Sequence, residues 1–484
     1  MNISIFDVIY SQKKITKPIR LIEFFAGYGS QALALKYLGV PFEHYKICEW
    51  AVKSIQAYKD IHFSKDNIDY SKPLSIETIK DYLLEVGISS NYNEPMTLEQ
   101  IKRLNEKQTR TIFNNICATH NLVNIQQVEG KDLEITDTDK YEYILTYSFP
   151  CQDLSLAGKG KGMSDTSTRS GMLWEVERIL TECKELGTLP QILLMENVPQ
   201  VHGIDNVNDF NKWQLRLEEL GYKNYWQDLI ATDYGIPQTR NRCFMVSILG
   251  DYYYTFPKPI PLNLKLKDIL EKNVDEKYYL SDKQIKDIQS WKAYEKPLET
   301  IDKEISKTLT TRSGDYTSSM QLVKDESLKK DLCNKLIQNG LVEEGDVVKH
   351  SYTQQILDGN KKCVEKNDGN MITLTTRGDC VGVCVGTYQY AKSDNFMQGR
   401  DRLQIGKETS DTLQTTPKEG IVNSDLRIRK LTPYECFALM GVKKEDYLKC
   451  AKNQSDASLY HLAGDSIVVN VLMAIFKELI WNMK

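Results

Sequence analysis

The sequence feature that most constrains the fold is a strand, turn and helix unit near the start of the chain. Residues 19–24 are branched and aromatic, as in a buried strand, and residues 32–38 have helical composition, closed by Gly39. Gly27 and Gly29 lie in the turn, where they let the backbone approach a ligand at the amino end of the helix. The unit predicts an α/β protein with a parallel sheet, although a Gly-x-Gly turn alone is a weak sign of a nucleotide site.

The next predicted strand adds a carboxylate to this turn. Residues 45–48 read as a strand that ends at Glu49, twenty positions after Gly29, where nucleotide-binding α/β folds hold an acid for ribose hydroxyls. Trp50 follows and could lie against an adenine face. An exposed acid beside a half-buried indole would show the same spacing, so both interpretations stay open.

A second informative stretch runs from a buried strand at 141–147 into Pro150-Cys151-Gln152. Proline cannot continue a sheet, so the backbone should leave it at the carboxyl edge, where open α/β sheets bind ligands. The glycine-rich loop that follows carries Lys159, Lys161 and Arg169, and positive surroundings favour a reactive thiolate. The alternative is a cysteine that acts as a small hydrophobic residue.

Two further strand ends supply an acid and two arginines. Residues 192–195 lead to Glu196, a plausible acid partner for a thiol, or otherwise a helix cap. Arg240 and Arg242 precede the strand at 243–248 and point to one side of an extended chain. This arrangement suits recognition of phosphate or carbonyl oxygens, and a solvated edge strand would look similar.

The remaining segments suggest how the chain is organised. Residues 60–125 are polar and helix-prone, which predicts a helical insertion, and the core resumes at 128–133, where Asp132 could accept a hydrogen bond from a base amine. After Tyr252 the sequence is rich in threonine, glycine and lysine. A loose repeat occurs there, at Thr308–Asp315, Thr373–Asp379 and Thr412–Thr416. Each copy reads either as a strand that presents an arginine at a glycine turn or as a hairpin with a solvated tip.

Order returns at the end of the chain. Thr432 can cap a helix that begins at Pro433, and a final helix is expected to open at Gly464-Asp465-Ser466. Its apolar face should pack on the first domain and comprises Val468, Val469, Leu472, Ile475, Phe476 and Leu479.

Composition limits the functional classes. The 484 residues suffice for two or three domains, and the net charge of −4 argues mildly against indiscriminate coating of nucleic acid. We expect a cytoplasmic protein, because no signal-peptide pattern and no apolar run of membrane-spanning length stand out. The eleven cysteines form no Cys-x-x-Cys pair, so neither a metal site nor a disulfide framework is expected.

In their order, these motifs resemble those of the bacterial and phage DNA (cytosine-5) methyltransferases. The resemblance rests on Phe25–Gly29, Glu49-Trp50, Asp132-Leu133, Pro150-Cys151-Gln152, Glu196-Asn197-Val198, Gln238–Arg242, Arg429–Pro433 and Gly464-Asp465-Ser466. It implies an α/β, Rossmann-like sheet that uses S-adenosylmethionine, joined to a smaller, mostly β or irregular target-recognition domain. The implied domains are a catalytic and cofactor-binding domain at 1–250, target recognition at 251–426, and a return segment at 427–484.

The resemblance also implies roles for individual residues. Cys151 would attack carbon 6 of a flipped-out cytosine while Glu196 steadies ring nitrogen 3; Arg242 would hold the base carbonyl, and Arg240 a phosphate or Glu196. The implied cofactor-binding residues are Phe25, Ala26, Gly27, Gly29, Glu49, Trp50, Asp132, Leu133, Pro150, Asp465 and Ser466. The implied DNA-binding residues are Gln152, Ser155, Lys159, Lys161, Arg169, Arg312 and Arg377.

Two departures from the family pattern and two rival functions are also part of the prediction. Ser30 stands where many members of the family have glycine, and Asp465 where many have asparagine.

The expected partner is duplex DNA, with a separately encoded restriction endonuclease as a possible associate and a monomer as the expected state. One rival is a transfer RNA methyltransferase on the same scaffold, although the Cys-Phe-Thr motif of that branch is not found. The other is a catalytically inactive DNA-binding regulator.

Overall fold

The computed structural model describes most of the first half of the chain and separate pieces of the second. The described residues are 11–12, 15–149, 170–281, 306, 308–309, 322–325, 347–349, 364–365, 381–383, 389–391, 402–404 and 427–480. They divide into two compact units, the first comprising 1–271, 303–321 and 431–484, and the second 272–302 and 322–430.

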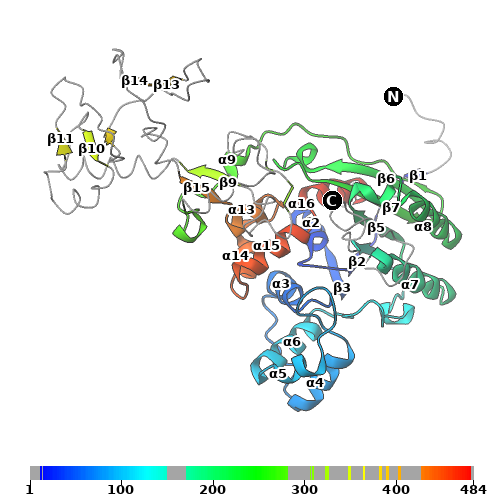
Figure 1. Ribbon diagram of the computed structural model, residues 1–484. Coiled ribbons are helices and arrows are strands. Elements are labelled where there is room, and N and C mark those ends of the chain that lie inside the picture. Colours follow the sequence, from blue (N-terminus) through cyan, green and yellow to red (C-terminus); the bar gives the residue numbers. More distant parts are fainter. Residues whose placement is uncertain are drawn as a thin grey trace, which may run out of the picture. The chain divides into compact units, whose positions relative to one another are not determined.

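A six-stranded sheet with the order β3-β2-β4-β5-β7-β6 forms the centre of the first unit (Figure 1). Strands β3, β2, β4 and β5 are parallel, whereas β7 runs antiparallel to both of its neighbours. The strands are β2 (Ile19–Phe24), β3 (Phe42–Cys48), β4 (Glu142–Tyr147), β5 (Ile192–Asn197), β6 (Tyr222–Ile230) and β7 (Asn241–Leu249). This doubly wound arrangement confirms the predicted Rossmann-like fold class.

The strand order fixes where a ligand can bind. From β2 the chain goes first to β3 on one side and only later to β4 on the other, so the order reverses at β2. Connections that leave in opposite directions open a crevice at the carboxyl ends of such strands. The residues that follow β2 and β4 are therefore placed beside one another.

The central strands of the sheet are buried on both faces because helices cover them. Alternate residues of β2, β4, β5 and β7 pack in one apolar core against α7 (Leu173–Glu185) and α8 (Val207–Leu220). Helix α2 (Ser30–Leu38) packs against α16 (Val469–Ile480), as the sequence predicts for the final apolar face (Figure 1).

The C-terminal helices differ from the prediction in one respect. Helix α15 (Asp456–Asp465) ends where the final helix was expected to open, and α16 begins only at Val469. The predicted opening at Gly464 is therefore wrong. A short link joins two helices there, and a Gly-Asp-Ser sequence is compatible with either end of a helix.

The segment Asp456–Ile480 is apolar enough to pass for a membrane span, yet 72% of its most apolar window is buried in the fold, as in a core helix.

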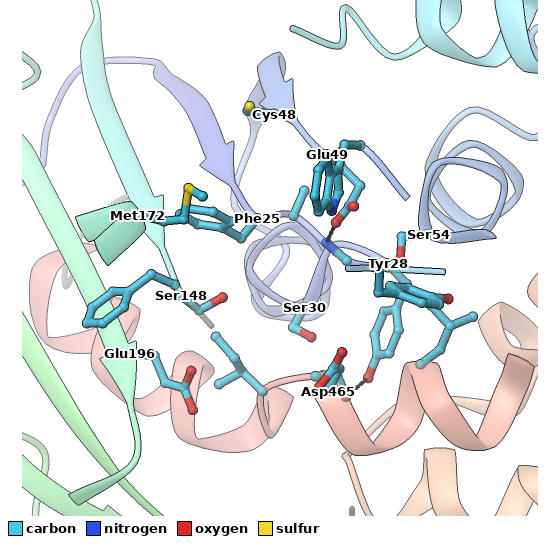
Figure 2. Close-up of a pocket in the computed structure, with 18 of the residues that line it drawn as sticks. Phe25, Tyr28, Ser30, Cys48, Glu49, Ser54, Ser148, Met172, Glu196 and Asp465 are labelled. Carbon is cyan, nitrogen blue, oxygen red and sulfur yellow. Dashed lines mark hydrogen bonds between the residues drawn. The ribbon is translucent and has the colours of Figure 1, made fainter. Parts of the chain in front are cut away.

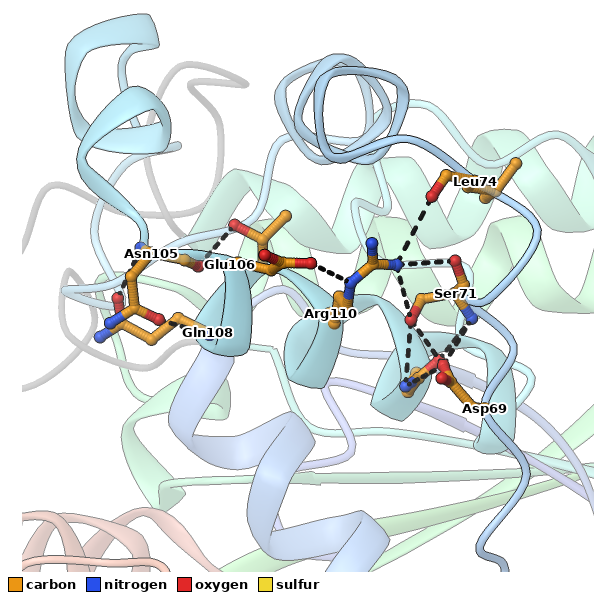
Figure 3. Close-up of polar contacts among 9 residues, drawn as sticks. Asp69, Ser71, Leu74, Asn105, Glu106, Gln108 and Arg110 are labelled. Carbon is orange, nitrogen blue, oxygen red and sulfur yellow. Dashed lines mark hydrogen bonds and ion pairs between the residues drawn. The ribbon is translucent and has the colours of Figure 1, made fainter.

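The predicted helical insertion lies between β3 and β4. It contains α4 (Ile76–Glu85), α5 (Leu98–Arg103) and α6 (Glu106–Ala118), and α3 (Val52–His62) precedes it. Isoleucines and Phe113 give it a small apolar core of its own. Arg110 on α6 ties this helix to the segment before α4, since it donates to the backbone carbonyls of Ser71 and Leu74 and pairs with Glu106 (Figure 3).

The division of the chain differs from the predicted boundaries of 250 and 426. Residues 251–271 belong to the first unit, because Tyr254 donates to Ile475 O and Glu271 N donates to Glu435. Ser306 N also donates to Pro237 O, which places 303–321 with the first unit. Additional short elements here are β1 (Ser11–Gln12), β8 (Tyr252–Tyr253), α9 (Leu266–Ile269), α13 (Pro433–Ala438) and α14 (Lys444–Ala451).

The second unit is described by short antiparallel strands. Its β15 (Arg427–Lys430) pairs with β9 (Leu322–Asp325), and the other pairings are β10 with β11 and β12, and β13 with β14. The latter strands are β10 (Val347–Lys349), β11 (Val364–Glu365), β12 (Val381–Val383), β13 (Gln389–Ala391) and β14 (Arg402–Gln404). This agrees with the predicted β or irregular second domain.

Candidate functional site

A pocket with a volume of about 250 Å³ opens at the crevice between the ends of β2 and β4. Its walls come from the turn after β2, the end of β3, the ends of β4 and β5, the start of β7, and the end of α15. Predicted site residues that line it are Phe25, Ala26, Gly27, Glu49, Trp50, Glu196, Arg240, Arg242, Asp465 and Ser466. In the view of Figure 2, Glu196 and Ser148 lie on one side and Glu49 and Ser54 on the other.

The turn after β2 is built on left-handed backbone positions. Phe25, Gly27 and Gly29 all have positive φ angles, of 56°, 56° and 82°. Gly29 precedes α2, and a Cβ there would collide with the side chains of His62 and Tyr58, which explains the glycine without a contact to any ligand. Gly27 lines the pocket itself, so its backbone is accessible to an occupant.

Glu49 is the buried acid of this pocket. Its carboxylate accepts hydrogen bonds from Gly27 N at 2.9 Å and Ala51 N at 2.8 Å, so the acid is fixed against the glycine turn (Figure 2). Burial raises the pKa of Glu49 to about 7. Each carboxylate oxygen retains a lone pair, and the group can still accept hydrogen bonds from hydroxyls of a ligand.

The C-terminal loop is fastened to the same turn. Tyr28 OH donates to Ser466 Oγ at 2.8 Å, and that buried bond connects residues far apart in the sequence. Asp465 beside it keeps about half of its side chain exposed. The loop therefore brings a hydroxyl and a carboxylate to the pocket that β2 opens.

Glu196 and Arg242 form an ion pair in the pocket. Arg242 Nε lies 3.1 Å from Glu196 Oε1, on the neighbouring strands β5 and β7. Burial raises the pKa of Glu196 above its ordinary value, while Arg242 and Arg240 act in the opposite direction. The result is a carboxyl group that holds its proton more readily than an exposed glutamate and can hydrogen-bond to an occupant of the pocket.

Of the two partners predicted for Arg240, a phosphate or Glu196, the structure supports an electrostatic action on Glu196. The Nη atoms of Arg240 donate to the carbonyls of Leu309, Gly464 and Ser466 at 2.7 to 3.1 Å, and the residue is only 4% exposed. A guanidinium committed to three backbone carbonyls holds the end of α15 in place. These contacts give Arg240 a positioning role, and its contact with a phosphate remains a prediction.

Asn197 connects the ends of β4 and β5. Its Nδ2 donates to Phe149 O at 3.0 Å, and its Oδ1 accepts from Val198 N at 2.8 Å. The side chain is 2% exposed, so neither bond competes with water. Phe149 is the last described residue before Pro150-Cys151, and Asn197 thus fixes the point from which that motif departs.

Asp132 and Leu133, which were predicted to contact a cofactor, do not line this pocket. They lie in a 3-10 turn (Gly130–Leu133) that packs against α7, where Leu133 is buried in the core and Asp132 accepts from Glu129 N. Asn124 and Ile125 line the pocket instead. They are brought there because the side chain of Asn121 hydrogen-bonds to both backbone groups of Glu49.

Several lining residues were not foreseen from the sequence. Tyr92 and Asn93 come from the helical insertion, and His461 comes from α15. The insertion carries no motif that would point to them. The positions of Tyr92 and Asn93 follow from backbone hydrogen bonds between Ser89 and the residues around Trp50.

Other predicted site residues lie outside the part of the chain that the structure describes. They are Pro150, Cys151, Gln152, Ser155, Lys159, Lys161, Arg169, Arg312 and Arg377. Their roles remain predictions.

One cluster of possible metal ligands occurs among the described residues, contrary to the scattered pattern of the sequence. His202, Asp228 and Cys243 place their ligand atoms within 4.8 Å of one another. His202 Nε2 lies 2.9 and 3.1 Å from the two carboxylate oxygens of Asp228. This pairing accounts for two of the three groups without an ion.

Comparison with known proteins gives a consistent result. The family model for C-5 cytosine-specific DNA methylases matches residues 98–481. The type II methyltransferase M2.ScrFI of Lactococcus lactis subsp. cremoris is 30% identical over 95% of this chain and 99% of its own length. The orphan methyltransferase M.SssI of Spiroplasma monobiae is 38% identical over 55% of this chain and 68% of its own.

A solved structure shares the fold. A mutant form of DNMT2 from Spodoptera frugiperda aligns with 95% of this chain and 99% of its own, with a TM-score of 0.52 and 16% identity. At that identity the likeness concerns the architecture alone.

Proposed function

The chain belongs to the family of C-5 cytosine-specific DNA methylases and is a DNA (cytosine-5-)-methyltransferase, and we propose that the pocket at the ends of β2 and β4 is where the methyl group is transferred. The observation that carries this proposal is the presence, in one pocket, of the Glu196–Arg242 pair and of the Glu49–Gly27 contact. The Glu196–Arg242 pair suits recognition of a nitrogen heterocycle, and the Glu49–Gly27 contact suits binding of a nucleoside.

The residues at the β2 end fit S-adenosylmethionine. Glu49 offers a buried acceptor for ribose hydroxyls, Trp50 a flat apolar face, and Gly27 a backbone without a side chain. Asp465 and Ser466 add polar groups from the C-terminal loop. When bound, this cofactor supplies an electrophilic methyl group. We expect S-adenosylhomocysteine to occupy the same residues after transfer.

The residues at the β5 end fit the chemistry of the base. Carbon 5 of cytosine is a poor nucleophile until a thiolate adds to carbon 6, and we assign that addition to Cys151. Glu196 would protonate or hydrogen-bond ring nitrogen 3, which neutralises the charge that develops as the sulfur–carbon bond forms. After carbon 5 has accepted the methyl group, its proton leaves to a base such as water. The electron pair of that bond then expels the Cys151 thiolate.

Arg242 and Asn197 keep this acid in place. Arg242 contacts Glu196 directly and would also hold the carbonyl oxygen of the base. Asn197 joins the strand of Glu196 to Phe149, two residues before Cys151 in the sequence. Asn197 therefore ties the strand that carries the acid to the strand that leads, along the sequence, to the thiol.

The target cytosine must leave the DNA helix, because a thiol can approach carbon 6 only from above the ring. We propose that Gln152, Ser155, Lys159, Lys161 and Arg169 contact the DNA during this step. Arg312 and Arg377 are proposed to read the recognition sequence, at least one of them at a guanine edge. We further propose a monomeric cytoplasmic enzyme that acts on duplex DNA. The type II names of its relatives favour a role in restriction-modification, beside a separately encoded endonuclease.

The test compares the parent with Cys151→Ser. We expect Cys151→Ser to lose transfer of labelled methyl groups to duplex DNA and to retain DNA binding, because the hydroxyl is a far weaker nucleophile. Transfer at the parent's rate by this variant would rule out the assigned role. Transfer by the parent to transfer RNA, and not to DNA, would instead support the RNA-directed rival.

A further inference from the structure

The helical insertion reaches the proposed cofactor pocket through one short loop. Within residues 88–96, Met96 N donates to Ile88 O at 2.7 Å and closes the loop upon itself. Ser89 exchanges backbone hydrogen bonds with Trp50 O and Val52 N, at 2.8 and 2.9 Å. The loop is thus tied to the segment that carries Glu49 and Trp50.

At the tip of this loop, Tyr92 stacks on His461 of α15. The ring centroids are 4.0 Å apart, with an angle of 37° between the planes. Both residues line the pocket, so the pair joins the insertion to α15 across one wall of it. Tyr92 also has a left-handed backbone, with φ of 65°.

Each member of this pair presents a buried polar atom that makes no hydrogen bond of good geometry in the described part of the chain, although the hydroxyls of Ser54 and Ser458 lower the pKa of Tyr92. These atoms are Tyr92 OH and His461 Nε2; the latter lies 3.4 Å from Asp465 Oδ2. Burial of such atoms is unfavourable unless a hydrogen-bond partner is supplied. Burial and the charge of Glu49 raise the pKa of the Tyr92 hydroxyl, so it stays a neutral donor and acceptor.

We infer that Tyr92 and His461 form a subsite for the ribose of the nucleoside cofactor. Ribose hydroxyls donate and accept hydrogen bonds, which matches a phenol, an imidazole nitrogen and the adjacent Glu49 carboxylate. The inference rests on the proposed function, and it explains what the insertion contributes, because the insertion carries a cofactor-binding residue on a preformed loop. This subsite would be specific to chains that possess the insertion.

The test measures binding of S-adenosylhomocysteine by calorimetry to the full-length parent and to three variants. Tyr92→Phe keeps the ring stack and removes the hydroxyl, so its Kd should rise roughly 3- to 10-fold. Tyr92→Ala also removes the aromatic ring that forms part of the pocket wall, and it should raise Kd roughly 10- to 100-fold. Tyr70→Phe is the matched control, because it removes a hydroxyl bonded to Asp66 in the insertion, outside the pocket; its Kd should stay within about twofold of the parent's.

Kinetics separate cofactor binding from folding. In Tyr92→Phe, KM for S-adenosylmethionine should rise while KM for DNA and the thermal midpoint without cofactor stay unchanged, because the ring and its stack on His461 are kept. Parent-like Kd values for both Tyr92 variants would overturn the inference, as would an equal loss in Tyr70→Phe. If Tyr92→Ala fails to fold, Tyr92→Phe decides. A parent that binds no cofactor would count against the proposed function instead.

Discussion

Replacement of Asn197 by alanine offers a quantitative test of how the thiol and the acid are held together. The change removes the bonds to Phe149 O and Val198 N, both inside the protein. A buried group that loses its partner costs about 1–3 kcal/mol, so the free energy of unfolding should fall by about 2–4 kcal/mol. Since the departure point of the Cys151 motif would shift, kcat should also fall, by roughly 100-fold.

The assay pairs urea unfolding with single-turnover methyl transfer. Asn115→Ala serves as the control, because Asn115 is a buried residue of the insertion whose amide donates to Gln56, away from the pocket. The control should lose stability, and its transfer rate should match the parent's. If Asn197→Ala lost stability but transferred methyl groups at nearly the parental rate, the reasoning about this connection would be refuted.

Two further predictions concern the buried acids. Glu23 accepts from Tyr58 OH and Ala32 N, and burial raises its pKa to about 7 from 4.5. The folded protein therefore keeps a proton that the unfolded chain releases, and its stability should fall as pH rises between these values, by roughly 2–3 kcal/mol. Glu23→Gln should reduce that slope in urea titrations and leave the share of Glu49, whose pKa is also raised to about 7; an unchanged slope would contradict the assignment. For Glu49→Gln, the loss of a charged acceptor shared by Gly27 N and Ala51 N should raise the Kd of S-adenosylhomocysteine roughly 10- to 100-fold. DNA affinity measured alongside should not change, and a general loss of both would indicate misfolding.

The sequence predicted features that depend on local order. The β2 turn and Glu49 were found because a glycine turn and a strand end leave a fixed spacing. The central fold class followed from the same alternation of strands and helices, and the structure confirms it.

The features of the site that the sequence did not predict depend on contacts between distant segments. Arg240 was expected to contact a phosphate or Glu196, yet its Nη atoms donate to carbonyls more than 60 residues away along the chain. Asn124 and Ile125 carry no recognisable motif, and their place in the pocket wall depends on the contacts of Asn121 with Glu49, 72 residues away along the chain. Tyr92 had no signal at all, since the insertion that carries it matches no motif.

The central claim is that one sulfur atom bonds to the target base, and the most direct measurement uses duplex DNA that contains 5-fluorocytosine. Fluorine at carbon 5 cannot leave as a proton does, so the intermediate should accumulate when S-adenosylmethionine is present. We predict a stable protein–DNA adduct that peptide mass spectrometry assigns to Cys151. An adduct on a different side chain, or none with DNA that the enzyme otherwise methylates, would contradict the account.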